Sequence, residues 1–178
     1  MNKIFSDRIA DVPKSFIREI LKVAINKEVI SFAGGLPNRD LFPVEDLQKA
    51  ADKVFKIYGS DSLQYSNSEG LIELREYIAN RYKTMHGINV NTNNILITNG
   101  SQQGLDLLAK IFVNEKDDVI IEEPGYLGAI QAFSVFRAKF HPVKLNNDGL
   151  DLDELEYALK YSDPKLMYCV PNFQNPSG

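Results

Sequence analysis

Apolar residues recur at helical spacing in the first half of the chain. From Val44 to Gly59 they fall at i, i+3, i+4, i+7, i+8 and i+11, which predicts one amphipathic helix. Pro43 suits the first turn of this helix and Gly59 its end. A similar pattern predicts a second helix from about Leu71 to Met85, and a shorter helix is predicted over Ser15–Ile25.

After residue 94 the pattern changes, and short apolar runs alternate with helical stripes. The runs predict strands over Ile95–Thr98, Val119–Ile121, Lys139–Leu145 and Leu166–Val170. The stripes predict helices over Leu105–Val113, Tyr126–Phe136 and Leu152–Tyr161. Strands that alternate with helices predict an α/β layer with a mostly parallel sheet.

The composition excludes several classes of protein. With 44% hydrophobic and 25% charged residues, the 178-residue chain is not of the disordered class, and its net charge of −4 disfavours a nucleic-acid partner. Its single cysteine, Cys169, excludes an internal disulfide framework and fits the reducing cytoplasm. No apolar stretch approaches the roughly 20 residues that a membrane span needs. His86 and His141 lie far apart and have no second ligand at helical spacing, so no metal site is expected.

The segment Thr98–Asp106 carries the most informative local pattern, because it joins a predicted strand to a predicted helix. Gly100 lets the backbone turn sharply and approach a ligand closely. Ser101, Gln102 and Gln103 would then lie at the helix N-terminus, where unpaired N–H groups and the helix dipole favour an anion. The segment is neither a Walker loop nor a dinucleotide fingerprint. It fits a phosphate site without a lysine, although Ser101 alone is more simply explained as an N-cap.

Four further segments carry residues that could contact a ligand. Tyr126 follows a strand, where ligands of open α/β sheets bind, and could lie on a flat ligand or be a core tyrosine. Asn175 follows the last strand, and its amide could donate to a ligand oxygen or only mark a turn. Gly35, in a glycine pair, permits close backbone approach, and Tyr65 lies in a polar loop. Taken singly, a flexible turn is the better explanation for Gly35 and a solvated loop for Tyr65.

Taken together and in this order, these segments are specific to one family of proteins. They read SFAGGLPNRDLFP, LQYSNSEGLIELREYI, ILITNGSQQGLDLLAKIF, EEPGYLGAIQAF and PNFQNPSG. From about Ser15 onward the chain resembles the class I/II aminotransferases, which are fold type I pyridoxal-phosphate enzymes, and among them the 2-aminoadipate/kynurenine aminotransferase branch. The resemblance implies pyridoxal 5'-phosphate as cofactor and amino-group transfer between an amino acid and a 2-oxo acid. It also implies the α/β fold of the large domain of this class, with a mostly parallel sheet flanked by helices.

The resemblance assigns roles to the cofactor-facing residues. Ser101, Gln102 and Gln103 would hold the cofactor phosphate, Tyr126 would stack on the pyridine ring, and Asn175 would hydrogen-bond the ring hydroxyl oxygen. These roles agree with the chemistry of the side chains, because the cofactor supplies the reactivity and the protein orients and polarises it.

Three further residues take roles at the substrate side and at a dimer interface. Tyr65 would reach the phosphate of a partner chain, which implies a homodimer. Gly35 would border the substrate, and Arg18 matches an arginine that shapes substrate choice in this branch.

The resemblance also implies an incomplete domain organisation. Residues 1–43 would form an N-terminal arm and substrate-side loop, residues 44–178 would form part of the cofactor-binding large domain, and the C-terminal small domain would be absent. The Schiff-base lysine of the family would lie beyond residue 178, because its Ser-x-Ser-Lys context does not occur here. The strand over Ile95–Thr98 would lack the neighbours that separate it from the other strands. These expectations describe the N-terminal portion of an aminotransferase that is inactive alone.

Two alternatives to an enzyme remain open at this stage. Some bacterial transcription regulators carry an aminotransferase-like domain that senses pyridoxal phosphate, with a DNA-binding domain before it. Here the family-like region begins within the first two dozen residues, so no room is expected for such a domain. The other alternative is a truncated chain without a catalytic role.

Overall fold

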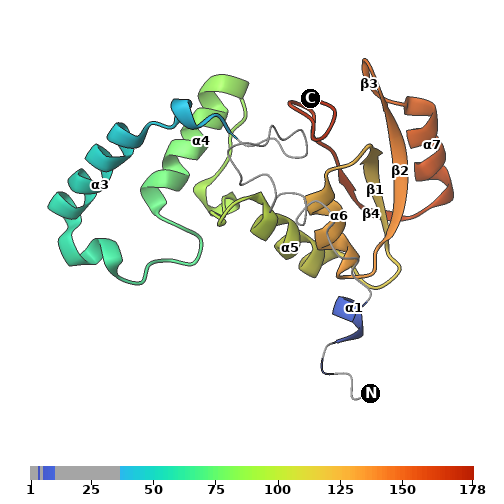
Figure 1. Ribbon diagram of the computed structural model, residues 1–178, viewed down its shortest axis with the longest axis horizontal. Helices are drawn as coiled ribbons and strands as arrows, with labels where there is room; N and C mark the ends of the chain where they lie inside the picture. The colour runs from blue at the N-terminus through green and yellow to red at the C-terminus, as the bar shows by residue number, and fades with distance from the viewer. Residues whose placement is uncertain (1–3, 5, 11–36) are drawn as a thin grey trace, which may run out of the picture. The chain divides into compact units, whose positions relative to one another are not determined.

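The computed structural model describes Ile4, Ser6–Ala10 and residues 37–178 of the chain (Figure 1). The predicted helix over Ser15–Ile25 lies outside the described residues. The described residues divide into two compact units: one holds residues 37–97, and the other holds Thr98–Gly178 together with the short helix α1 (Asp7–Ala10).

The unit of residues 37–97 contains the two predicted amphipathic helices. Helix α3 covers Val44–Tyr58 and helix α4 covers Ile72–His86, so both predictions are confirmed to within one residue. Gly87 ends α4 in the left-handed conformation with φ of 68°, which glycine adopts without strain. Three short 3-10 helices complete the unit: η1 (Arg39–Leu41), η2 (Gly59–Leu63) and η3 (Thr92–Asn94).

The predicted strand over Ile95–Thr98 does not form in the structure. Ile95 is extended, with φ of −117° and ψ of 124°, but residues 95–98 have no ladder partner within the described part of the chain. Ile97 instead donates its N–H to the Glu69 carbonyl at 3.0 Å. The prediction was wrong because an apolar run shows only that a segment is suited to a sheet, whereas a strand also needs a paired neighbour.

The unit of residues 98–178 is built on a four-stranded sheet of order β3-β2-β1-β4. The strands are β1 (Asp118–Glu123), β2 (Lys139–Asn146), β3 (Gly149–Leu150) and β4 (Pro164–Tyr168). β1 pairs in parallel with both β2 and β4, and only the short β2–β3 hairpin is antiparallel. The predicted mostly parallel sheet is therefore confirmed. The hairpin strand β3 was not predicted, and β4 begins two residues earlier than predicted.

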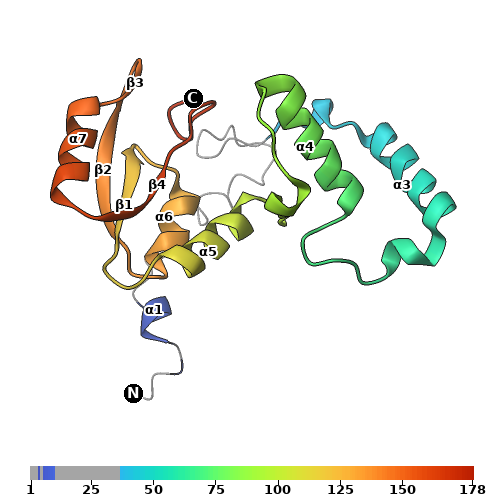
Figure 2. The same ribbon diagram turned by 180° about the vertical axis from the view of Figure 1, so that it is seen from behind.

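Helices cover both faces of this sheet (Figures 1 and 2). Helices α5 (Ser101–Phe112) and α6 (Leu127–Ser134) lie on one side, and α7 (Leu152–Tyr161) lies on the other. The central strand β1 explains this arrangement, since Val119 and Ile121 belong to one buried cluster and Ile120 to another. A parallel strand covered on both faces is apolar without alternation, which is why 119–121 forms an unbroken apolar run.

The two clusters each belong to one side of the sheet. Side chains of α5 and α6 complete the first cluster, and Val143 of β2 and Ala158 of α7 complete the second. Among the described residues, Phe133, Ile120, Val119 and Val143 are the largest fully buried side chains. Full burial of an apolar side chain of this size contributes about 1.5–3 kcal/mol, so these four residues form the apolar centre of the unit.

Asp118 joins the amino ends of the three parallel strands. Its Oδ1 accepts from His141 Nε2 at 2.7 Å and lies 3.3 Å from Lys139 Nζ, and its Oδ2 accepts from the Asp163 N–H at 3.1 Å. The hydrogen bond from His141 is the main cause that lowers the pKa of Asp118 from 3.8 to about 2, and the Asp163 N–H and Lys139 act in the same direction. A carboxyl whose pKa is lower in the folded state stabilises the fold when it is ionised.

We expect Asp118→Asn to reduce the free energy of unfolding at pH 7. The stabilisation by Asp118 is complete above pH 3.8, the ordinary pKa, and is lost as the pH falls through about 2. The difference between wild type and variant should therefore shrink as the pH is lowered from 4 to 2, which urea denaturation at several pH values measures. Asp163→Asn is the matched control, because it removes only an exposed pair with Lys165 and keeps the Asp163 N–H. A difference that is constant with pH would contradict the assignment.

Candidate functional site

Helix α5 begins with an uncapped turn at the predicted phosphate segment. Gly100 is its N-cap, with φ of 80° and ψ of 169°, and among the described residues no side chain caps the first N–H groups. A φ of this sign favours glycine, which explains why a glycine stands at this turn. Ser101 is therefore the first helical residue rather than the N-cap, and it is exposed. The helix N-terminus offers unpaired N–H donors and one hydroxyl at the same place.

The side chains of Gln102 and Gln103 are bonded within the chain. Gln102 Nε2 donates to the Gly128 carbonyl at 3.1 Å, and Gln103 Oε1 accepts from the Asn99 N–H at 2.5 Å. Gln102 thereby ties the start of α5 to the first turn of α6. In this arrangement the two side chains shape the turn, and the role of both glutamines toward a phosphate stays a prediction.

Tyr126 lies at the start of the neighbouring helix. It is the N-cap residue of α6, is half-buried and packs against the first cluster, with its ring centroid 6.4 Å from that of Tyr168. Burial raises the pKa of Tyr168 above its ordinary value of 10.0, so this neighbouring hydroxyl stays protonated. Because Gln102 bonds Gly128, two residues after Tyr126, the structure brings the predicted phosphate turn and the predicted stacking tyrosine together.

The ring of Tyr126 lies directly over Gly128. A Cβ at Gly128 would lie 2.6 Å from Cε1 and Cζ of Tyr126 and 2.7 Å from its Oη. We expect Gly128→Ala to displace the Tyr126 ring while the free energy of unfolding changes by no more than about 1 kcal/mol, since alanine favours the helix. The ring resonances of Tyr126 and Tyr168 in NMR spectra measure this displacement.

Gly104→Ala in α5 is the matched control for this prediction. A Cβ at Gly104 would meet only Thr98 Oγ1, at 3.8 Å, which is an ordinary contact. Unchanged tyrosine resonances in Gly128→Ala would show that this glycine does not set the position of the ring.

Asn175 lies in the segment 171–178 that follows β4, and it is exposed. The carboxyl ends of β1 and β4 share one edge of the sheet because the two strands are parallel. The segment that leads to Tyr126 and the segment that holds Asn175 therefore leave the sheet at the same edge, where ligands of open α/β sheets bind.

The other three predicted residues lie outside the unit of residues 98–178. Tyr65 belongs to the unit of residues 37–97 and is 99% exposed. Arg18 and Gly35 lie outside the described residues. The roles proposed for these three residues therefore stay predictions.

Two buried polar residues at this edge were missed in the sequence. Glu122 is 4% exposed and Gln174 is 7% exposed, and they hydrogen-bond to each other at 3.0 Å. The spacing of Glu122 could have indicated its burial, since it lies two residues after Ile120 and so shares a sheet face with it. No sequence signal pairs it with Gln174, which is 52 residues away.

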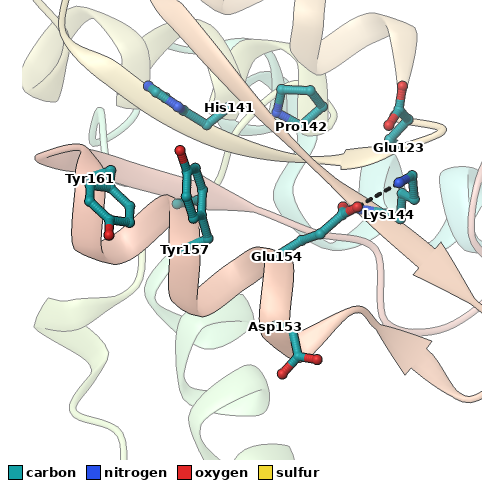
Figure 3. A pocket seen from close by; sticks show the side chains of 9 residues that line it. Glu123, His141, Pro142, Lys144, Asp153, Glu154, Tyr157 and Tyr161 are labelled. Carbon is teal, nitrogen blue, oxygen red and sulfur yellow. Dashed lines mark hydrogen bonds and ion pairs between the residues drawn. The ribbon is translucent and has the colours of Figure 1, made fainter.

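A separate hollow of about 730 Å³ lies between β2 and α7 (Figure 3). Lys144 Nζ donates to Glu154 Oε1 at 2.6 Å beside it, and this bond raises the pKa of Lys144 and lowers that of Glu154. Ala158 of the second cluster lines the hollow, whereas Tyr126 packs against the first cluster. The hollow therefore lies on the face of the sheet opposite Tyr126, and none of the predicted site residues lines it.

The described residues hold neither a cluster of metal-ligating side chains nor a membrane-spanning helix. Among them, no three His, Cys, Asp or Glu side chains are grouped in a way that could hold a metal ion. No helix in the same part of the chain has the length and apolar character to cross a membrane.

The chain is similar to known proteins over almost all of its length. Residues 27–178 match the family model of aminotransferase class I and II. A 2-aminoadipate transaminase of Thermus thermophilus is 41% identical over 99% of this chain and 43% of its own length. The crystal structure of Pyrococcus horikoshii kynurenine aminotransferase, in complex with PMP, KYN and KYA, superposes with a TM-score of 0.90 at 36% identity, over 98% of this chain and 44% of that one.

A relative of another kind is the uncharacterised helix-turn-helix-type transcriptional regulator YdcR of Escherichia coli, which is 32% identical over 97% of this chain and 36% of its own length. The chain thus spans less than half the length of each of these relatives. The family match covers most of the chain, and the α/β fold agrees with it. We conclude that the chain belongs to the class I and II aminotransferase family.

Proposed function

We propose that the complete gene product containing these 178 residues is a pyridoxal-phosphate-dependent aminotransferase that exchanges an amino group between an amino acid and a 2-oxo acid. The observation that carries the proposal is the uncapped start of α5, which Gln102 ties to the turn after Tyr126. Family membership over residues 27–178 supports it. When bound, pyridoxal phosphate supplies an electron sink for the negative charge that develops at the α-carbon of the amino acid.

The donors at the start of α5 fit a phosphate. The N–H groups of the first turn and the exposed Ser101 hydroxyl present hydrogen-bond donors where the helix dipole favours negative charge. No lysine is needed, because charge-assisted hydrogen bonds to an anion are stronger than neutral ones. Gln102 and Gln103 contribute their backbone N–H groups and hold the turn in shape with their side chains.

The residues beside this turn fit an aromatic ring with a polar substituent. Tyr126 would cover one face of the pyridine ring and exclude water from it, and the Asn175 amide would donate to the ring hydroxyl oxygen. Both residues lie after parallel strands that end at the same sheet edge. We place the cofactor-binding domain in residues 44–178 and an arm with a substrate-side loop in residues 1–43.

The substrate side of the proposal depends on residues outside this site. Gly35 would border the substrate and Arg18 would influence which amino acid is accepted. Tyr65 of a second copy of the chain would reach the phosphate, so the active form would be a homodimer. The single cysteine, Cys169, and the absence of a disulfide framework favour a cytoplasmic enzyme.

The test is a coupled transamination assay of the complete gene product across a panel of amino acids, with 2-oxoglutarate and other 2-oxo acids as acceptors. We expect turnover with at least one donor and conversion of bound cofactor to its amino form in single-turnover spectra. A protein that binds the cofactor but converts it with no donor would contradict the enzyme and support the alternative, an aminotransferase-like sensor such as the regulator relative suggests.

A further inference from the structure

The side-chain amide of Gln174 uses all of its hydrogen-bonding capacity. Its Nε2 donates to Glu122 Oε2 at 3.0 Å and to the Pro124 carbonyl at 2.7 Å. Its Oε1 accepts from the N–H of Ser177 at 2.8 Å and from the hydroxyl of the same serine at 2.7 Å. A primary amide has two donors and two acceptor lone pairs, so none is left over. The reversed orientation would set the amide oxygen against the Glu122 carboxylate and the Pro124 carbonyl, and the amide nitrogen against the Ser177 N–H, so the amide is fixed in one direction.

Glu122 extends this network to the end of β4. Its Oε2 accepts from Gln174, and its Oε1 accepts from the Val170 N–H at 2.9 Å. Glu122 and Gln174 are both more than nine-tenths buried, and buried polar groups are costly unless they are paired. We call the bonds among Glu122, Pro124, Val170, Gln174 and Ser177 the Gln174 network. It holds the carboxyl ends of β1 and β4 to the segment 171–178.

The Gln174 network encloses one of the residues that the proposed function assigns to the cofactor. Asn175 lies between Gln174 and Ser177, in a turn that the Gln174 amide closes. Tyr126 follows two residues after Pro124, whose carbonyl bonds the same amide. A single buried side chain thus contacts both segments that leave the sheet at this edge.

We propose that Glu122 and Gln174 are positioning residues, which set the place of Asn175 relative to Tyr126 and thereby determine affinity for the cofactor without touching it. This inference rests on the proposed function. A network that only stabilises the fold would change stability and leave cofactor affinity as it is. If the network positions Asn175, cofactor affinity should fall in variants that break its hydrogen bonds and recover in a variant that restores them.

The test exchanges the two side chains singly and together. Gln174→Glu sets a carboxylate against Glu122 and the Pro124 carbonyl, so both donor bonds are lost. In Glu122→Gln a single amide oxygen remains at position 122, and it would have to accept from both the Val170 N–H and Gln174 Nε2. In the double variant the amide at position 122 donates to the carboxylate at position 174 and still accepts from the Val170 N–H. The exchange therefore restores the bond between the two side chains and leaves only the Pro124 bond broken.

Two readouts are measured on the complete gene product. Hydrogen exchange of the peptide 167–178, by mass spectrometry, reports the Val170 and Ser177 amides, which bond to side chains of the network. Equilibrium titration with pyridoxamine 5'-phosphate reports affinity, and this probe has no aldehyde that could react with lysines. Each single variant should exchange faster and bind about tenfold more weakly or worse, since each loses a buried hydrogen bond. The double variant should recover at least half of the loss in log affinity.

Several outcomes would overturn the inference. Single variants that exchange faster but bind as tightly as wild type would show a purely structural network, as would a double variant whose loss equals the sum of the single losses. If the single variants do not fold, Ser177→Ala replaces them, because it removes only one of the four bonds to Gln174, and unchanged affinity with faster exchange then counts against positioning. Glu156→Gln, exposed on α7, is the control for a charge change and should alter neither readout. A wild-type protein that does not bind the probe overturns the proposed function and this inference with it, whereas equal binding by wild type and variants overturns the inference alone.

Discussion

Replacing Phe133 with alanine is expected to lower the free energy of unfolding by about 3–5 kcal/mol, which is the usual cost of truncating a buried phenylalanine. Phe133 is 1% exposed and is one of the four largest fully buried side chains of the chain's described part. It lies on α6 within the cluster that joins α5, α6 and β1, and its ring meets Tyr168 edge-on at 6.3 Å. Natural domains unfold with only about 5–15 kcal/mol, so the loss would be a large fraction of the total.

Urea denaturation of the wild type and the variant measures this loss. Phe173→Ala is the matched control, because Phe173 is 96% exposed and its truncation should change the free energy of unfolding by less than about 0.5 kcal/mol. The effect should also reach the candidate site, since Phe133 and Tyr126 pack against the same Tyr168 ring. A loss below about 1 kcal/mol for Phe133→Ala would mean that the cluster collapses around the gap, contrary to the close packing found here.

The bounds of helices could be predicted where neighbouring residues in the sequence supply the hydrogen bonds that cap the helix. Helix α7 has the predicted bounds, and its N-cap Asp151 accepts hydrogen bonds from the N–H groups of Asp153 and Glu154. The apolar stripe of helix α5 starts only at Leu105, whereas the glycine turn at Gly100 placed Ser101 at the helix N-terminus, where the helix begins. The first turn carries no apolar residue because it is exposed, so periodicity alone could not find its start.

The sheet could be predicted only where pairing follows from apolar runs. β4 ends at Tyr168 rather than at Val170, because Val170 leaves the ladder and donates its N–H to Glu122. The run at Ile95–Thr98 has the same apolar character but finds no ladder partner within the described residues. Both differences arise from contacts between segments distant in sequence, and a single sequence does not reveal such contacts.

The candidate site likewise contains residues that local motifs reveal and contacts between distant segments that they do not. Ser101 and Tyr126 could be found from motifs, since a glycine turn before a helix and a tyrosine after a strand are local patterns. The bonded state of Gln102 could not be found, because its partner Gly128 lies 26 residues further along the chain. In the structure the side chain of this glutamine ties two helices together, and its role toward the phosphate stays a prediction.

Replacing Ser101 with alanine is expected to weaken cofactor binding about ten- to a hundredfold, or about 1.5–3 kcal/mol, as for a lost hydrogen bond to a charged group. The effect should come from Ser101 in particular, because the side chains of Gln102 and Gln103 are already bonded within the chain. Equilibrium titration of the complete gene product with pyridoxal 5'-phosphate measures the change.

Stability separates this effect from misfolding. Ser101 is the first residue of α5 and is exposed, so alanine there should change the free energy of unfolding by less than about 0.5 kcal/mol. Ser101→Thr keeps the hydroxyl and should bind the cofactor within about threefold of wild type, since the charge-assisted bond to the phosphate is retained. If Ser101→Ala and Ser101→Thr bind the cofactor equally well, the hydroxyl does not contact the phosphate, and the anion is held by the backbone N–H groups of α5 alone.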